Sequence, residues 1–158
     1  MFDAVLFDLD GTLADTAPDL CGTVNILLTE EGRPQQPFAS LRPHTSQGVR
    51  GLLGQGFGID SAHHEYERLA ARFLEIYAGQ LCDLSRLFDG IPDLLDALES
   101  HGIAWGIVTN KRARYTEPLV AALGLVPRTR CVVSGDTTAE AKPSPLPILH
   151  ACQILRCL

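Results

Sequence analysis

The chain has 158 residues, a length that predicts one domain or one domain carrying a large insertion. Apolar residues make up 46% and charged residues 20%, which is ordinary for a globular protein and argues against disorder along the whole chain. The formal net charge of −6 argues against nucleic acid or an anionic membrane as the main partner. A small anionic substrate would therefore need a local positive group or a metal ion.

Five cysteines are present, widely spaced and without a CxxC pair, which argues against both a disulfide framework and a zinc site. We expect them to be small buried residues in a reducing compartment. No basic and apolar leader opens the chain, and no apolar run approaches the length of a membrane helix. The sequence therefore predicts a cytoplasmic protein without a membrane tether.

The first predicted element is a strand. The apolar run at residues 4–7 is typical of a buried parallel strand, and it is followed by polar residues and Gly11. A helix is expected next, which begins within residues 15–18, where an N-cap candidate and Pro18 stand, and ends near Gly32.

Further helices are expected up to residue 84. Residues 33–43 contain three prolines and predict a loop, while residues 45–58 predict a short helix despite five glycines. Ser61 is a candidate N-cap for a third helix, which would carry apolar side chains from Tyr66 to Tyr77 along one side.

Strands and helices alternate in the second half of the chain. Pro92 opens a predicted helix whose inward side chains would be Leu94, Leu95 and Leu98. The remaining expected elements are strands at residues 103–108 and 131–133 and helices at residues 117–123 and 145–155.

This order predicts an α/β fold with a Rossmann-like parallel sheet and an inserted helical cap. The core would comprise residues 1–14 and 86–158, and the cap residues 15–85. Ligands of such sheets bind beyond the carboxyl ends of the strands, where a cap inserted after the first strand would lie.

Two aspartates follow the first predicted strand. In an extended chain, residues two apart point the same way, so Asp8 and Asp10 would face one site. Two carboxylates so close need a cation or a shared proton, and with only oxygen ligands on offer Mg²⁺ is the natural cation. Gly11 permits a sharp turn, after which backbone amides at Gly11 and Thr12 could hold phosphate oxygens.

Polar groups also follow the later strands. Thr109 and Asn110 offer a hydroxyl and backbone amides after one strand, and the Lys142 ammonium comes after the next. An acidic pair, a hydroxyl and a cation at neighbouring strand ends are the groups that phosphoryl transfer through an aspartyl-phosphate requires.

These segments resemble the signatures of haloacid dehalogenase-like hydrolases. Residues 7–16 (FDLDGTLADT) resemble the first signature, residues 107–111 (IVTNK) the second and residues 141–145 (AKPSP) the third. Residues 134–138 (SGDTT) are similar to phosphoglycolate phosphatases within the family. The resemblance runs over nearly the whole chain. It implies a phosphatase whose cap is the helical type inserted after the first strand.

The resemblance implies a role for each matching residue. Asp8 would attack phosphorus, and Asp10 would protonate the leaving alcohol and then activate water. Thr109 and the Asn110 amide would bind the phosphoryl group, and Lys142 would hold Asp8 and the phosphate. Mg²⁺ would contact the Asp8 carboxylate and the Asp10 carbonyl.

The family's fourth signature, an acidic pair after a further strand, has no counterpart between Pro143 and Leu158. We therefore expect a sheet that is incomplete at its carboxyl end, weak Mg²⁺ binding and slow or absent turnover. An exposed sheet edge also predicts self-association.

Substrate choice would fall to the cap, where Arg50 is the candidate for binding an anionic group of a small phosphorylated metabolite. Phosphoglycolate is the favoured substrate, and N-acetylmuramate 6-phosphate is the alternative. A phosphomutase or a dehalogenase fits less well, because Asp10 followed by Gly11 and Thr12 fits phosphatases better. The other classes are a phospho-accepting receiver domain, whose order of motifs differs, and a non-catalytic relic of the fold.

Overall fold

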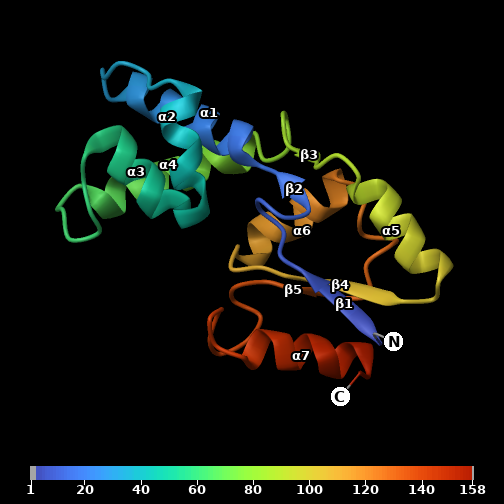
Figure 1. Cartoon of the computed structure of the whole chain (residues 1–158). Helices are drawn as coiled ribbons and strands as arrows, with labels where there is room; N and C mark the ends of the chain where they lie inside the picture. Colours follow the sequence, from blue (N-terminus) through green and yellow to red (C-terminus); the bar gives the residue numbers. More distant parts are fainter. Residues whose placement is uncertain (1–2, 158) are drawn as a thin grey trace. The chain divides into compact units, whose positions relative to one another are not determined.

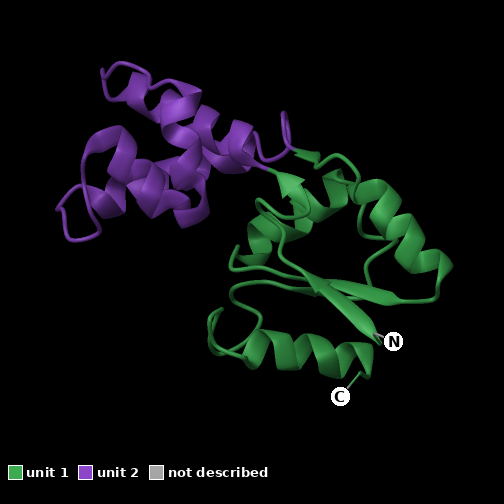
Figure 2. Cartoon of the chain, viewed as in Figure 1, with its two compact units in different colours: residues 1–15, 86–158 green, residues 16–85 purple. Residues whose placement is uncertain are grey.

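The computed structural model describes residues 3–157. These divide into two compact units: unit 1 runs to Asp15 and resumes at Arg86, and unit 2 spans Thr16–Ser85 (Figure 2). The chain passes from unit 1 to unit 2 between residues 15 and 16, one residue after the predicted boundary. It returns to unit 1 between residues 85 and 86, at the predicted boundary.

Unit 1 is built on a three-stranded parallel sheet with the strand order β1-β4-β5. The strands are β1 (Ala4–Phe7), β4 (Ala104–Val108) and β5 (Val132–Val133). Phe7 lies beside Ile107, and Val108 lies beside Val133, so all three strands end at the same edge of the sheet. The predicted α/β class with a parallel sheet is confirmed.

Helices cover both faces of this sheet. One face carries α7 (Leu146–Leu155), and the other carries α5 (Ile91–Ser100) and α6 (Ala113–Ala122) (Figure 1). The core between these layers consists of fully buried apolar side chains, among them Leu95, Trp105, Ile107, Leu119 and Val133.

Unit 2 is a bundle of helices whose apolar sides pack on one another. It contains α1 (Ala17–Glu30), α2 (Phe38–Leu41), η1 (Arg42–Gln47), α3 (Gly48–Phe57) and α4 (Tyr66–Gly79). Buried side chains recur at helical spacing along α1 and α4, for example Val24, Leu27, Leu69 and Phe73.

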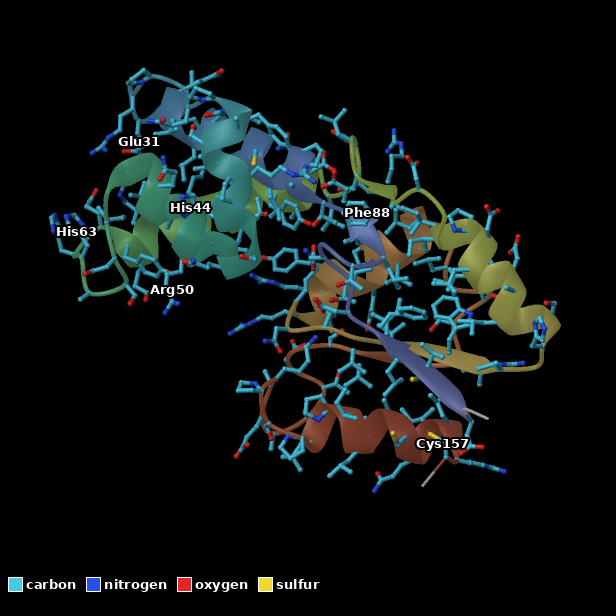
Figure 3. The ribbon with its side chains drawn as sticks, viewed as in Figure 1. Glu31, His44, Arg50, His63, Phe88 and Cys157 are labelled. Carbon is cyan, nitrogen blue, oxygen red and sulfur yellow. The ribbon has the colours of Figure 1, made fainter. Side chains whose placement is uncertain are left out.

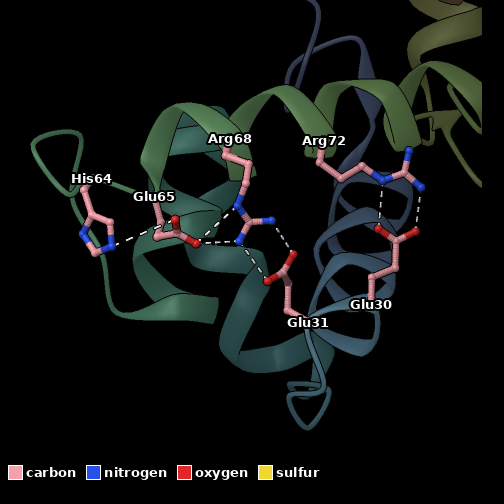
Figure 4. A network of polar contacts seen from close by, with 6 residues as sticks. All are labelled: Glu30, Glu31, His64, Glu65, Arg68 and Arg72. Carbon is pink, nitrogen blue, oxygen red and sulfur yellow. Dashed lines mark hydrogen bonds and ion pairs between the residues drawn. The ribbon is translucent and has the colours of Figure 1, made fainter.

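Paired charges join α1 to α4 on the surface of unit 2 (Figure 4). Arg68 donates to both carboxylate oxygens of Glu31, at 2.7 and 2.9 Å, and Arg72 donates likewise to Glu30. These hydrogen bonds hold the pKa of both carboxyl groups below the ordinary value. The side chains remain exposed to solvent, so the pairs add modestly to stability.

A buried carboxylate holds the two ends of unit 2 together. Asp19, 2% exposed at the start of α1, accepts hydrogen bonds from the backbone amides of Leu84 and Ser85 and from the Ser85 hydroxyl. It thereby fastens the chain that leaves the bundle to the helix that enters it.

Three expectations for the first half of the chain are corrected. Strand β1 is half-buried, because among residues 3–157 its one strand neighbour is β4. The expected loop at residues 33–43 contains α2 and the start of η1, since the prolines stand at positions where a helical turn tolerates them. Glu65, rather than Ser61, is the N-cap residue of α4.

The remaining corrections concern helix ends and short strands. Leu94 is 43% exposed, and only Leu95 of α5 is fully buried. Helix α6 begins at Ala113, four residues earlier than expected. A short antiparallel pair, β2 (Ala14–Asp15) with β3 (Arg86–Leu87), carries the chain out of unit 1 and back, and the sequence did not predict it.

All five cysteines are free thiols. Cys21 and Cys131 are buried, as expected, but Cys82, Cys152 and Cys157 are half-exposed. Burial raises the pKa of the Cys131 thiol. Within residues 3–157, no helix combines the length and the apolar character needed to span a bilayer.

Candidate active site

Asp8 and Asp10 follow directly after the end of β1, where successive side chains of the extended backbone still point to opposite sides. Leu9 between them is fully buried, so the two half-exposed aspartates lie on the other side of the backbone. The turn that follows folds back tightly: the amides of Leu13 and Ala14 both donate to the Leu9 carbonyl. The buried leucine and this turn fix the backbone that presents the two carboxylates.

The turn uses the amides that were expected to hold phosphate oxygens. Gly11 adopts a φ of 78°, as its predicted role in a sharp turn requires. Its amide donates to the Ala14 carbonyl at 2.8 Å, and the Thr12 amide donates to Leu9 at 3.3 Å. Because both groups are engaged within the turn, this geometry does not support phosphate binding by them.

Lys142 reaches the end of β1 from the loop after β5. Its Nζ donates to Asp8 Oδ1 at 2.9 Å and to the Val108 carbonyl at 2.7 Å. An ammonium has three N–H donors, so these two bonds leave room for a third, to a phosphoryl oxygen. The lysine therefore joins the ends of two neighbouring strands beside the first aspartate.

The Asn110 side chain holds Lys142 by its backbone. Asn110 Oδ1 accepts from the Lys142 amide at 2.9 Å, and Asn110 Nδ2 donates to the Lys142 carbonyl at 3.0 Å. The sequence assigned Asn110 to phosphate binding through its backbone amide and gave its side chain no part. The structure shows that the side chain positions the lysine.

Thr109 lies at the end of β4 and is 3% exposed. Its amide donates to the Val133 carbonyl of β5, and its hydroxyl oxygen accepts from the Lys111 amide at 3.2 Å. A hydroxyl that accepts one hydrogen bond can still donate its own proton. Thr109 is thus a fixed potential donor at the strand end.

Lys111 belongs to the site as well, although sequence reasoning gave it no role. Its Nζ donates to Asp10 Oδ1 at 2.7 Å, and its side chain is only 11% exposed. The one available signal was its place directly after Thr109 and Asn110. A lysine so near a strand end is usually solvated, and only the tertiary contact reveals its partner.

The loop after β5 fastens this segment from the other side. The Gly135 amide donates to the Lys111 carbonyl at 2.8 Å, and a Cβ at Gly135 would collide with the Asn110 backbone. Asp136 Oδ1 accepts from the Ala113 amide at the start of α6, at 2.8 Å. The segment that resembles phosphoglycolate phosphatases therefore supports the loop that carries Asn110 and Lys111.

The site offers hard oxygen donors of the kind that Mg²⁺ prefers. The Asp8 carboxylate and the Asp10 backbone carbonyl could serve as two such oxygen ligands. Among residues 3–157, no group of three or more His, Cys, Asp and Glu side chains is arranged to hold a metal ion.

Arg50 is the predicted site residue that lies outside unit 1. It stands on α3 of unit 2 and is exposed (Figure 3). Its role in anion binding stays a prediction. The adjacent His63 and His64 rings contact each other with centroids 4.4 Å apart, and the His64 side chain is largely exposed to solvent.

Comparison with known proteins identifies the family of this chain. The sequence profile described as haloacid dehalogenase-like hydrolase matches residues 5–158, which is nearly the whole chain. The chain belongs to the haloacid dehalogenase-like hydrolase family.

The curated relatives include phosphatases with two different names. The chain is 46% identical over 149 residues to a phosphoglycolate phosphatase of Xanthomonas campestris and 41% identical over 152 residues to an N-acetylmuramic acid 6-phosphate phosphatase of Pseudomonas aeruginosa. These matches cover 94% and 96% of this chain but 66% and 67% of the relatives. The chain thus spans about two thirds of the length of the curated relatives it matches.

The fold is shared with solved members of the family. The crystal structure of a predicted phosphoglycolate phosphatase from Haemophilus somnus superposes with a TM-score of 0.80 at 27% identity. The match covers 96% of this chain and 71% of that one.

Proposed function

We propose that this chain carries the nucleophile and the acid–base residue of a Mg²⁺-dependent phosphomonoester hydrolase. The observation that supports this most directly is the Lys142 ammonium, which binds Asp8 and the carbonyl at the end of the neighbouring strand. A carboxylate and a cation held together at a strand end suit attack on a phosphate ester, because the cation offsets the repulsion between two anions.

In the first step, an Asp8 oxygen attacks phosphorus while the bond from phosphorus to the ester oxygen breaks. Asp10 gives a proton to the departing oxygen, so that the product leaves as a neutral alcohol. Lys142 and the Thr109 hydroxyl hold the oxygens of the phosphoryl group during the transfer. The result is an aspartyl-phosphate on Asp8.

In the second step, Asp10 takes a proton from a water molecule as that water attacks phosphorus. The bond from phosphorus to the Asp8 oxygen breaks, which releases inorganic phosphate and restores the Asp8 carboxylate. Each residue ends the cycle in its starting protonation state.

Magnesium would be held by the Asp8 carboxylate and the Asp10 carbonyl. When bound, it supplies Lewis-acid polarisation of the phosphoryl oxygens and a template for their orientation.

We propose phosphoglycolate as the substrate, with N-acetylmuramate 6-phosphate as the second candidate. The relatives that bear these two activities in their names are similarly close to the chain, at 46% and 41% identity. A comparison of kcat/KM for the two esters with one protein preparation decides between them.

The test of the reaction class is formation of a phosphate-like adduct. The folded chain is incubated with Mg²⁺ and beryllofluoride, a mimic of the phosphoryl group, and formation of the reversible adduct is followed by ¹⁹F NMR. We expect the adduct on Asp8 and its loss in the Asp8→Asn variant. A chain that forms no adduct and releases no phosphate would instead be a non-catalytic relic of the fold.

The proposed ligand is a small phosphorylated metabolite rather than nucleic acid or a membrane surface, in keeping with the net charge of −6. The cytoplasm is the proposed location, on the strength of five free thiols. Self-association is proposed through the outer strands β1 and β5. Sedimentation at several concentrations tests it, and a monomer at every concentration would count against it.

A further inference from the structure

The backbone of Lys111 is fixed by hydrogen bonds from neighbouring segments. Its amide donates to the Thr109 hydroxyl, and its carbonyl accepts from the Gly135 amide at 2.8 Å and from the Thr116 hydroxyl at 3.0 Å. Both backbone polar groups are thus fixed by neighbouring segments. The position of the Cα atom, from which the side chain extends, is set by β4, α6 and the loop after β5 together.

The Lys111 side chain is directed into the site rather than into solvent. It is 11% exposed, against 28% for Lys142, and its ammonium lies 2.7 Å from Asp10 Oδ1. Confining a long lysine side chain costs up to about 2 kcal/mol in rotamer entropy, so this placement needs a compensating interaction. The hydrogen bond from the Lys111 ammonium to Asp10 Oδ1 supplies one, since hydrogen bonds with a charged donor are stronger than neutral ones.

Each of the two lysines binds a different aspartate. Lys142 binds Asp8, the proposed nucleophile, and Lys111 binds Asp10, the proposed acid and base. A proton donor contributes only when it lies within hydrogen-bond reach of the departing oxygen, so the direction of the Asp10 side chain limits the rate.

We propose that Lys111 is a positioning residue that fixes the orientation of the Asp10 carboxylate for proton transfer to the leaving group. This inference rests on the proposed function and adds to it a residue that acts through Asp10. It implies that Lys111 matters most for esters whose leaving group needs a proton.

The experiment compares the Lys111→Met variant with the unsubstituted chain on three phosphate esters. Phosphoglycolate and ethyl phosphate release alkoxides, which need protonation. p-Nitrophenyl phosphate releases an anion stabilised by its nitro group. For both alkyl esters we expect the rate of alcohol release in a single turnover, which reports the first step alone, to fall by about 100-fold with little change in KM, because general acid catalysis contributes about that much. For the aryl ester we expect this first-step rate to change by less than about threefold, whereas the second step, in which Asp10 is the base, is common to all three esters.

The ratio between esters separates this role from a structural one. A variant that is partly unfolded loses activity equally on all three esters, and that result would overturn the inference. A loss confined to phosphoglycolate would also overturn it, because Lys111 would then bind the substrate carboxylate. Arg112→Met removes a cation from the adjacent exposed position, and it should leave all three rates unchanged.

Two further readouts complete the design. The beryllofluoride adduct on Asp8 should form in Lys111→Met as in the unsubstituted chain, and its loss would show that Lys111 acts on the nucleophile instead. Lys111→Arg, which keeps the cation, should recover part of the alkyl-ester rate. If the unsubstituted chain hydrolyses none of the esters and forms no adduct, the proposed function fails, and this inference fails with it.

Discussion

The side-chain amide of Asn110 pairs with the backbone of Lys142 through two hydrogen bonds of 2.9 and 3.0 Å. The position of the Lys142 ammonium therefore depends on a residue from the loop after the neighbouring strand. Asn110→Ala removes both bonds, and we expect kcat/KM to fall about tenfold or more, because displacing a catalytic group by a fraction of its reach is costly. Steady-state kinetics with phosphoglycolate checks this.

The chain contains a matched control for that variant. Asn25 pairs with the backbone of Gln36 in the same way, at 2.8 and 3.0 Å, but within unit 2. Asn25→Ala should lower the melting temperature about as much as Asn110→Ala does, without the same loss of kcat/KM. Equal kinetic losses in both variants would mean that the Asn110 pair contributes only to folding.

The carboxylate of Asp136 accepts a hydrogen bond from the first amide of α6, as a helix-capping residue does. Asp136→Ala should destabilise unit 1 by about 1 kcal/mol, the usual cost of losing such a cap. Urea denaturation measures the change, and Asp93→Ala in the first turn of α5 serves as a comparison at an exposed position. A stability change no larger than that of Asp93→Ala would contradict the capping role.

Removal of the Asp19 carboxylate should destabilise unit 2 more strongly. Asp19→Ala leaves the amides of Leu84 and Ser85 without their acceptor in a buried setting, at a cost of about 3 kcal/mol. Chemical denaturation followed by circular dichroism measures it. Glu67→Ala, an exposed acidic residue in the first turn of α4, should change stability by far less.

The pairs between α1 and α4 make the stability of unit 2 depend on pH. Arg72 lowers the pKa of Glu30 below 4.5, so the folded state binds fewer protons there than the unfolded state. The stabilisation is therefore present above pH 4.5 and is lost as the pH falls through the lowered pKa. The melting temperature of Glu30→Gln should lie below that of the unsubstituted chain at pH 7, and this difference in melting temperature should shrink as the pH is lowered.

A comparison variant tests whether that trend belongs to the pair. Glu117 is exposed on α6 of unit 1. Glu117→Gln should show no comparable difference that disappears in acid. A difference in melting temperature between Glu30→Gln and the unsubstituted chain that stays constant from pH 7 to acid would rule out the ion pair as its source.

Local pattern was enough to predict most of the fold. Short apolar runs bounded by polar residues predicted β1, β4 and β5, and helical spacing predicted α1 and α4, because both signals reside in neighbouring residues. The pair β2–β3 was missed, since each strand has only two residues and is held by a partner about seventy positions away. Leu94 was wrongly predicted to point inward, because helical spacing does not show how much of the surface of α5 the sheet covers.

The sequence by itself determined which chemical groups stand at the strand ends: Asp8, Asp10, Thr109 and Lys142 all follow short apolar runs, and parallel strands bring such ends to one edge. The family resemblance already implied that Lys142 holds Asp8, and the structure places the two in contact. Only the tertiary structure decided that Lys111 binds Asp10 and that the Asn110 side chain supports a lysine 32 positions away. These contacts depend on side chains from separate loops, and their direction is set by backbone hydrogen bonds that no local pattern encodes.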